Sequence, residues 1–420
     1  MRIAVFHNLP SGGAKRTLAE AIGRLATRHQ VDVYTLSCAE HAFADIRQAV
    51  TSHDVCDFES LPLLRSPWGR ANQILRAADL LRLSRVARHI ARRIEREKYD
   101  VVLAHPCRFE QSPSVLRFLG RTPSAYYCHE PLRLVYEATP RRPYDGDTLL
   151  RRRMLNRVDP LPAVYRRLRR RVDRVNLRSA STVLVNSRFT ARAVERLYQV
   201  EARVSYHGVD TAKFHPIGGG KRHNVLSVGS LTPLKGFDFL VRAMAEYPAA
   251  GRPTLVLASN FANPPERDYL QHLARDSGVD LVLAGCVDDA ELVSLYNQAK
   301  AVVYAPIREP FGLVPLEAMA CATPVVAVAE GGIPETVLDG QTGFLTERDP
   351  GHFAAAVRRL VDDPALARKL GENGREHVLS HWSWDSAVRS LEAHLDTAVR
   401  TRSVATSRRA ASTRTSAERM

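Results

Sequence analysis

The stretch AVVYAPIREPFGLVPLEAMACATPVVAV, Ala301–Val328, holds two short apolar runs separated by a helix pattern. The outer runs, AVVYAP and TPVVAV, carry no charge and contain several valines, which is typical of strands buried on both faces. Between them, Leu313–Cys321 fits a helix with Leu316 and Met319 packing inward. Because a helix joins two buried strands, the stretch predicts a parallel sheet and an α/β fold.

The same rhythm of strand and helix runs through the second half of the chain. Five strands are predicted there: Asn224–Ser230, Thr254–Ser259, Asp280–Gly285, Ala301–Pro306 and Thr323–Val328. Each is separated from the next by a helix pattern. We therefore expect a doubly wound, Rossmann-like domain over residues 224–382.

An equivalent rhythm in the first half predicts a second Rossmann-like domain over residues 1–205, with these strands: Arg2–Asn8, Val31–Leu36, Asp100–Pro106, Ser124–Glu130 and Thr182–Ser187. Segment 206–223 is rich in Gly and polar residues and is predicted to be a linker. We expect a helix at 383–400 that returns to the N-terminal domain. A disordered basic tail is predicted at 401–420, which lacks any periodicity. The two domains should face each other across a cleft between the carboxyl ends of their sheets.

Composition narrows the class of protein further. The chain has 420 residues, of which 45% are hydrophobic, which suits a folded protein of two domains. No apolar run approaches the ~20 residues needed to cross a bilayer. The chain enters a strand pattern directly after Met1, so a cytoplasmic location is expected. Its six cysteines form no CxxC pair, which argues against a zinc site and a disulfide framework.

The formal net charge of +15 is concentrated in two segments. Residues 141–178 contain 13 Arg and 4 Asp, and residues 400–420 contain 6 Arg and 1 Glu. Such basic strips can attract an anionic membrane surface, a nucleic acid or an anionic substrate, or they can be solvated helix faces. The first segment predicts a cationic helix with Val164, Leu168 and Val172 on one face, which would suit the surface of an anionic membrane.

Two stretches predict contacts with phosphate. In VGSLTPLKGFDFLVRA, Val228–Ala243, a strand ends and Lys235 precedes a helix. The helix dipole, free N–H groups and an ammonium suit a diphosphate at that point. Near the N-terminus, Gly12 and Gly13 open the first helix, where a backbone without side chains can approach a phosphate or sugar. A surface lysine and a tight turn are the plainer interpretations of these patterns.

Two glutamates, Glu309 and Glu317, stand eight positions apart around a glycine at the mouth of an apolar segment. If both face the cleft, their acceptor-only oxygens can bind sugar and ribose hydroxyls. The amides of Gly312, Leu313 and Val314, at the start of the helix, can meet a phosphate. Two solvated glutamates on a helix turn would leave the glycine and the apolar surroundings unexplained.

These motifs, with AGCVDDAELVSLYNQA, GGIPE, DGQTGFL, YYCHEPLR and YHGVDTAKFHP, resemble the retaining two-Rossmann-domain glycosyltransferases of family 4 across residues 2–395. The resemblance implies a B-type fold and transfer of a hexose from a nucleotide-diphosphate sugar to a glycan or lipid-linked acceptor. It further implies surface polysaccharide or glycoconjugate synthesis, and YYCHEPLR favours mannose from GDP-mannose. The implied scheme passes through an oxocarbenium-like transition state, retains configuration and needs no metal or other cofactor.

The resemblance also assigns roles to single residues. His129 would lie at the reacting sugar and Glu309 at its hydroxyls, as the catalytic pair. The donor-binding residues would be Gly13, Ser230, Lys235, Val287, Phe311, Gly312, Leu313, Val314 and Glu317. Of these, Lys235 would bind the diphosphate, Glu317 the ribose and the Val287 backbone the base. Ser230 departs from the pattern, because the family usually has an arginine there. Neutralising the diphosphate would then rest on Lys235 and helix dipoles, or on another arginine that reaches in.

Two other classes of function stay open. A sugar-nucleotide epimerase or a phosphorylase would share the architecture, although no lysine for pyridoxal phosphate can be identified. A basic nucleic-acid-binding protein would use the net charge, but the chain lacks a recognisable reader motif, so we expect no nucleic-acid partner. The DGD triplet at Asp145 and Asp147 follows no strand, so no metal site is predicted there.

Overall fold

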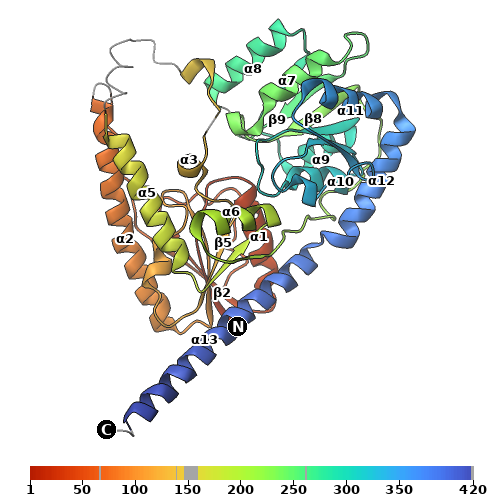
Figure 1. The fold of residues 1–420 in the computed structure, drawn as a ribbon. Coiled ribbons are helices and arrows are strands. Elements are labelled where there is room, and N and C mark those ends of the chain that lie inside the picture. Colours follow the sequence, from red (N-terminus) through yellow and green to blue (C-terminus); the bar gives the residue numbers. More distant parts are fainter. Residues whose placement is uncertain (66–67, 139, 146–158, 261–262, 418–420) are drawn as a thin grey trace.

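The computed structural model describes residues 1–65, 68–138, 140–145, 159–260 and 263–417. In these residues the chain folds into two α/β domains, each built on one parallel sheet (Figure 1). Buried hydrophobic clusters cover both faces of each sheet. The predicted pair of Rossmann-like domains is confirmed.

The N-terminal sheet has seven strands in the order β3-β2-β1-β4-β5-β6-β7, all paired in parallel. Its strands are β1 (Arg2–Asn8), β2 (Gln30–Leu36), β3 (Ser52–Cys56), β4 (Val101–Cys107), β5 (Ser124–Cys128), β6 (Thr182–Val185) and β7 (Ala202–Val204). Its helices are α1 (Gly13–Leu25), α2 (Asn72–Glu97), α3 (Arg133–Tyr136), α5 (Leu161–Arg178) and α6 (Arg188–Tyr198). The sequence analysis missed the edge strands β3 and β7, because both are short and carry polar residues.

The C-terminal sheet has six strands in the order β10-β9-β8-β11-β12-β13. Its strands are β8 (Asn224–Val228), β9 (Thr254–Ala258), β10 (Leu281–Ala284), β11 (Ala301–Tyr304), β12 (Val325–Val328) and β13 (Gly343–Thr346). Its helices are α7 (Phe237–Glu246), α8 (Pro264–Asp276), α9 (Asp289–Gln298), α10 (Leu313–Ala320), α11 (Pro350–Asp362) and α12 (Pro364–His381). Strand β13 begins within the stretch DGQTGFL and pairs with β12, but it was not among the strands predicted from the sequence.

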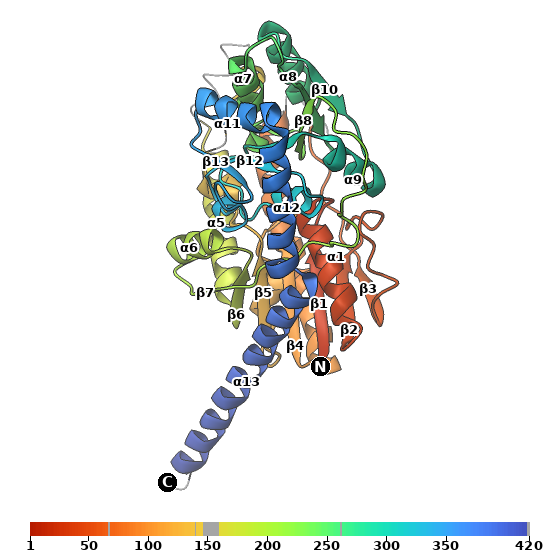
Figure 2. The same cartoon turned by 90° about the vertical axis from the view of Figure 1, so that its right-hand side faces the viewer.

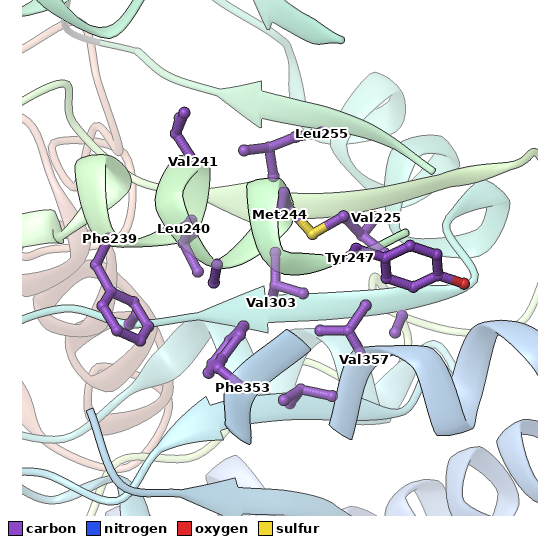
Figure 3. Packing of buried hydrophobic residues seen from close by; sticks show 14 of the residues in the cluster. Val225, Phe239, Leu240, Val241, Met244, Tyr247, Leu255, Val303, Phe353 and Val357 are labelled. Carbon is purple, nitrogen blue, oxygen red and sulfur yellow. The ribbon is translucent and has the colours of Figure 1, made fainter. Parts of the chain in front are cut away.

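Figure 3 shows how the C-terminal domain packs one face of its sheet. Side chains of α7 and α11 meet over β8, β9 and β11, and their residues are fully or almost fully buried. Phe239 and Phe353 meet edge to face, with ring centroids 5.4 Å apart. Aromatic pairs of this geometry add to the burial of apolar area. This face of the sheet is therefore covered by a closely packed apolar layer.

The last helix, α13 (Trp384–Ala417), belongs to the C-terminal half of the chain but packs on the N-terminal domain (Figures 1 and 2). Trp384, Val388 and Leu391 join the buried cluster formed by α1 and the N-terminal sheet. At the crossing point a Cβ on Gly208 would lie 2.5 Å from the Trp384 nitrogen, so only glycine lets the two connections pass so closely. Two chain crossings thus join the domains.

Both views show α13 projecting beyond the N-terminal domain, drawn as helix up to Ala417. Residues 401–417, which fall within the predicted tail, continue this helix. No helix among the described residues is both long enough and apolar enough to span a bilayer.

Candidate active site

The two domains meet through loops at the carboxyl ends of their strands. The Ser187 hydroxyl, at the end of β6, donates to the Pro310 carbonyl across the cleft at 2.5 Å. Glu335 of the GGIPE segment accepts hydrogen bonds from the backbone N–H groups of Arg188 and Phe189, both at 2.9 Å. The motif-bearing loops of one domain are therefore seated on the other.

The predicted diphosphate ligand, Lys235, forms an ion pair with Glu309, with Nζ and Oε2 2.9 Å apart. Both side chains are largely buried. Lys235 lies just before α7, which begins after Gly236 in the left-handed region (φ 66°). A Cβ on Gly236 would lie 2.1 Å from the Ala305 carbonyl oxygen, so the glycine lets the lysine loop pack on the loop that leads to Glu309.

The loop that carries Glu309 is fixed from behind by the GGIPE segment. The Gly332 N–H donates to the Glu309 carbonyl at 2.7 Å. A Cβ on Gly331, which has φ 67°, would lie 2.1 Å from the same carbonyl oxygen. The two glycines therefore allow the GGIPE backbone to contact the backbone at Glu309 directly, and this contact positions the Glu309 carboxylate.

Three helix N-termini in the cleft lack a side-chain cap. These are α1 behind Gly12, α7 behind Gly236 and α10 behind Gly312. A Cβ on Gly13 would lie 3.4 Å from the Leu313 Cδ1 atom, so α1 and α10 begin next to each other. Free N–H groups at converging helix N-termini are suited to an anion. This geometry unites five predicted donor residues: Gly13, Phe311, Gly312, Leu313 and Val314.

Glu317 lies on α10, and its carboxylate is buried. The Tyr296 hydroxyl donates to its Oε2 at 2.7 Å, and an Arg16 guanidinium nitrogen lies 3.3 Å from its Oε1. Burial raises the pKa of Glu317, and the Arg16 charge opposes that rise. Burial raises the pKa of Tyr304, and the charges of Glu309 and Glu317 raise it further because that phenol lies near the two carboxylates. Both members of the predicted pair are thus near one residue of β11.

Arg16 is a site residue that the sequence analysis missed. It lies on α1 and reaches across the cleft to Asp289 at 2.7 Å as well as to Glu317. Its position three residues after Gly13 is the one local signal, because the first turn of that helix faces the cleft. The pairing itself joins residues about 300 positions apart in the chain, which no local pattern encodes.

Arg133 is a second cation that sequence analysis did not assign. Its Nη2 donates to the Ile307 carbonyl at 2.7 Å, and its Nε pairs with Glu137 at 3.0 Å. Burial raises the pKa of Glu130, while the positive charges of Arg133 and Lys235 oppose that rise. Both cations are therefore near one carboxylate in the cleft. Ser230, at the end of β8, is half-buried and leaves its position without a charge.

His129 follows β5 and is almost completely buried. Its Nε2 lies 3.1 Å from the Nδ1 of His105, and its ring is stacked with that of His207. Burial lowers the pKa of His129 to about 3, so its imidazole is neutral near pH 7. A neutral imidazole can donate one hydrogen bond to a hydroxyl while accepting another. His105 was not predicted as its partner.

Val287 lines a cavity of about 460 Å³ between α1 and the start of α9. Arg16, Lys213 and Asp289 line the same cavity, and Lys213 pairs with Asp289 at 2.8 Å. The predicted base-binding residue is thus beside the arginine that contacts Glu317. Among the described residues no group of three or more His, Cys, Asp or Glu side chains could hold a metal ion. Asp147 lies outside those residues.

Comparisons with known proteins agree with this geometry. Residues 11–213 match the family model "Glycosyltransferase Family 4", and residues 211–377 match "Glycosyl transferases group 1". The D-inositol 3-phosphate glycosyltransferase of Acidothermus cellulolyticus is 34% identical over 265 residues, covering 57% of this chain and 59% of that protein. The alpha-maltose-1-phosphate synthase of Mycobacterium tuberculosis is 34% identical over 203 residues, covering 42% and 52%. The matched regions thus span between half and three fifths of these relatives.

Solved structures share the fold at low identity. Sucrose-phosphate synthase of Thermosynechococcus elongatus has a TM-score of 0.70 at 22% identity, covering 94% of this chain and 98% of that one. HepE of Anabaena, solved with UDP-glucose, has a TM-score of 0.68 at 20% identity, covering 94% and 100%. The assignment agrees with the two facing Rossmann-like domains and with the lysine and glutamates in the cleft. Because two adjoining family models together match residues 11–377, this chain belongs to the family-4-like glycosyltransferases of the B-type fold.

Proposed function

We propose that this protein transfers a hexose from a nucleotide-diphosphate sugar to a glycan or lipid-linked acceptor, in the synthesis of surface polysaccharide or glycoconjugate. One observation supports the proposal: the N-terminal domain reaches the segments that carry the paired Lys235–Glu309 and Glu317, because Arg133 donates to the Ile307 carbonyl and Arg16 lies 3.3 Å from Glu317. Cations, acceptor oxygens and free helix N-termini are the groups that bind phosphate, sugar hydroxyls and ribose.

In the proposed reaction, the diphosphate replaces Glu309 as the partner of Lys235. The released carboxylate of Glu309 then accepts hydrogen bonds from the hydroxyls of the donor sugar. Negative charge grows on the leaving diphosphate as its bond to the sugar breaks, and Lys235 with the helix N-termini stabilises that charge. The acceptor hydroxyl attacks from the face of the leaving group, gives its proton to the departing phosphate, and the configuration is retained.

His129 is proposed to hold a hydroxyl of the reacting sugar. Its low pKa keeps it neutral, so it contributes a hydrogen bond and no charge of its own near the developing oxocarbenium. A buried imidazolium there would oppose the positive charge of the transition state. The neutral ring avoids that cost.

A panel of nucleotide-diphosphate sugars tests the donor. Thermal shift and then donor hydrolysis are measured for GDP-mannose, which the YYCHEPLR resemblance favours, and for UDP-glucose, with Lys235→Ala as the inactive variant. Lys369→Ala, an exposed lysine on α12, is the matched control. We expect saturable binding of one donor by the native protein and by the control variant. Absence of binding to every nucleotide sugar would refute the proposal.

The acceptor is tested on the donor so identified. Two relatives carry a phosphorylated compound in their names, D-inositol 3-phosphate and alpha-maltose-1-phosphate, so phosphorylated polyols and sugars form one arm of the acceptor panel. Lipid-linked glycans form the other arm, in keeping with a proposed location in the cytoplasm at the inner face of the membrane. The anomeric configuration of the product, read by NMR, tests retention.

A further inference from the structure

One layer of the N-terminal domain presents an unusual outer surface. Helices α2 and α5 pack against each other and bury their inner residues in the same cluster on the sheet. Because both inner faces point to that cluster, both outer faces point away from the domain. Figure 1 shows the two helices along one edge of the protein. We call these two outer faces, with the lead-in residues Leu63 and Leu64, the α2/α5 face.

Large apolar side chains gather on the α2/α5 face. The exposed ones are Leu63, Leu64, Ile74, Leu81, Val164, Leu168 and Val175. Leu81 is 67% exposed and Val164 is 59% exposed, so both would bury substantial area against a partner. Most of the exposed large apolar residues described for the chain are on this face. The predicted stripe on α5 is seen at positions 164 and 168, whereas Val172 is partly buried.

Arginines surround these apolar side chains. The exposed residues of α5 include Arg166, Arg167 and Arg171, which form no ion pair with a described residue. Arg170 and Arg178 are also exposed but donate to the carbonyls of Val135 and Tyr198. The single carboxylate of that helix, Asp173, is fully buried and accepts from Ser112 and Tyr198. On α2 the exposed face carries several more arginines, and its one exposed acid is the last residue, Glu97.

The face also has a defined relation to the active site. In a parallel α/β domain, each helix begins where a strand ends, at the carboxyl edge of the sheet, and runs back to the opposite edge. Helices α2 and α5 therefore both begin at the edge that faces the cleft. Figure 1 shows their first turns on the side of the C-terminal domain. Ile74 and Val164 lie in those first turns, at the end of the face that is nearer to the cleft.

We propose that the α2/α5 face docks on an anionic phospholipid bilayer, with the apolar side chains in the headgroup region and the arginines on lipid phosphates. The arginines favour an anionic partner because the charges are complementary. The apolar side chains between them favour a membrane over a nucleic acid, because they can be buried in a bilayer but not against a phosphate backbone. This inference rests on the proposed function in one respect: it identifies the surface on which a lipid-linked acceptor would meet the cleft.

Flotation with vesicles tests the proposal. The full chain is mixed with vesicles of phosphatidylcholine alone or with 30% phosphatidylglycerol, a composition rich in anionic lipid, at low and at high salt. Three variants are compared: Arg167→Glu with Arg171→Glu on the face, Val164→Ser with Leu168→Ser on the face, and the control Arg368→Glu with Lys369→Glu on α12. The first and last pairs change the net charge equally, and residues 368 and 369 are exposed in the other domain.

We expect the native protein and the α12 control to float with anionic vesicles only. Each arginine near such a surface contributes about a fivefold gain in partition, so reversing two should lower it by a factor of at least about 25. Val164→Ser with Leu168→Ser should also reduce flotation while leaving binding to a mixed-sequence oligonucleotide unchanged. Equal flotation on neutral and anionic vesicles, or equal loss in the α12 control, would overturn the proposal.

Two further outcomes separate the hypotheses. If the serine pair floats like the native protein and the oligonucleotide binds as tightly as vesicles do, the face is an electrostatic site for polyanions and the membrane proposal fails. Donor hydrolysis is measured on the same samples without lipid. Hydrolysis without flotation refutes the docking alone, and flotation without any nucleotide-sugar binding refutes the proposed function alone.

Discussion

Replacing Glu317 with glutamine should weaken nucleotide binding while leaving the fold intact. In the structure Oε2 of this residue accepts from Tyr296 and Oε1 faces Arg16. Glutamine keeps one oxygen for the Tyr296 hydroxyl, and Arg16 keeps its 2.7 Å contact with Asp289. A ribose hydroxyl, however, loses a charged acceptor. Hydrogen bonds to charged groups contribute about 1.5–3 kcal/mol, so Kd should rise about 10- to 150-fold.

The assay is a cycle that combines protein and ligand changes. Calorimetry gives Kd for the native protein and Glu317→Gln, each with the ribonucleoside diphosphate and its 2′,3′-dideoxy analogue. If Glu317 binds the ribose, the native protein should lose as much affinity when the hydroxyls are removed as it loses through the substitution. The variant should lose little further affinity when the hydroxyls are removed. Glu372→Gln, an exposed glutamate on α12, controls for the change in charge. Equal losses of affinity in native protein and variant would refute the assigned contact.

Two other predictions concern the cleft and the core. Arg133→Gln should weaken diphosphate binding at least about tenfold, because it removes a cation near Lys235. Arg368→Gln, at an exposed arginine on α12, should not weaken it; calorimetry measures both. Phe353→Ala should lower the free energy of unfolding by about 3–5 kcal/mol in urea titrations, because the ring is fully buried.

Glu110→Gln should change how stability depends on pH. Burial raises the pKa of Glu110 to about 7, so the native carboxyl keeps its proton after the unfolded one has lost it near 4.5. Its contribution is complete below pH 4.5 and is lost as pH rises to about 7, at most about 3 kcal/mol. The variant should therefore lose less stability than the native protein between pH 5 and 8, as measured by denaturant titration.

Buried strands were the part of the fold that the sequence predicted well. The first strand was expected at Arg2–Asn8 and is observed there, since a continuous apolar run can be satisfied only inside a parallel sheet. The apolar edge strand β10 was predicted, but the edge strands β3, β7 and β13 escaped notice. Their ladders form only once the central strands exist, and their residues alone resemble turns. Local patterns therefore identify the middle of a sheet better than its edges.

The site shows the same division between local and distant information. Lys235, Glu309 and Glu317 lie in loops and helix starts of one domain, and short sequence motifs predict such local structure. Arg16 and Arg133 come from the other domain, and their contacts depend on how two folded domains meet. Such pairs leave no period or spacing in the chain, so they become visible only in the folded structure.

The charged side chains that the donor is proposed to use already have partners in the structure. Lys235 is paired with Glu309, and Glu317 is bonded to Tyr296 and Arg16. A donor must therefore exchange these contacts, and its net affinity is the difference between new and old bonds. This exchange favours the intact donor over the nucleoside diphosphate. A nucleoside diphosphate takes Lys235 away from Glu309 but supplies no sugar hydroxyls for the Glu309 carboxylate to bind. We thus expect the intact donor to bind more tightly than the nucleoside diphosphate, and Glu309→Gln should narrow that gap when the two Kd values are measured by calorimetry.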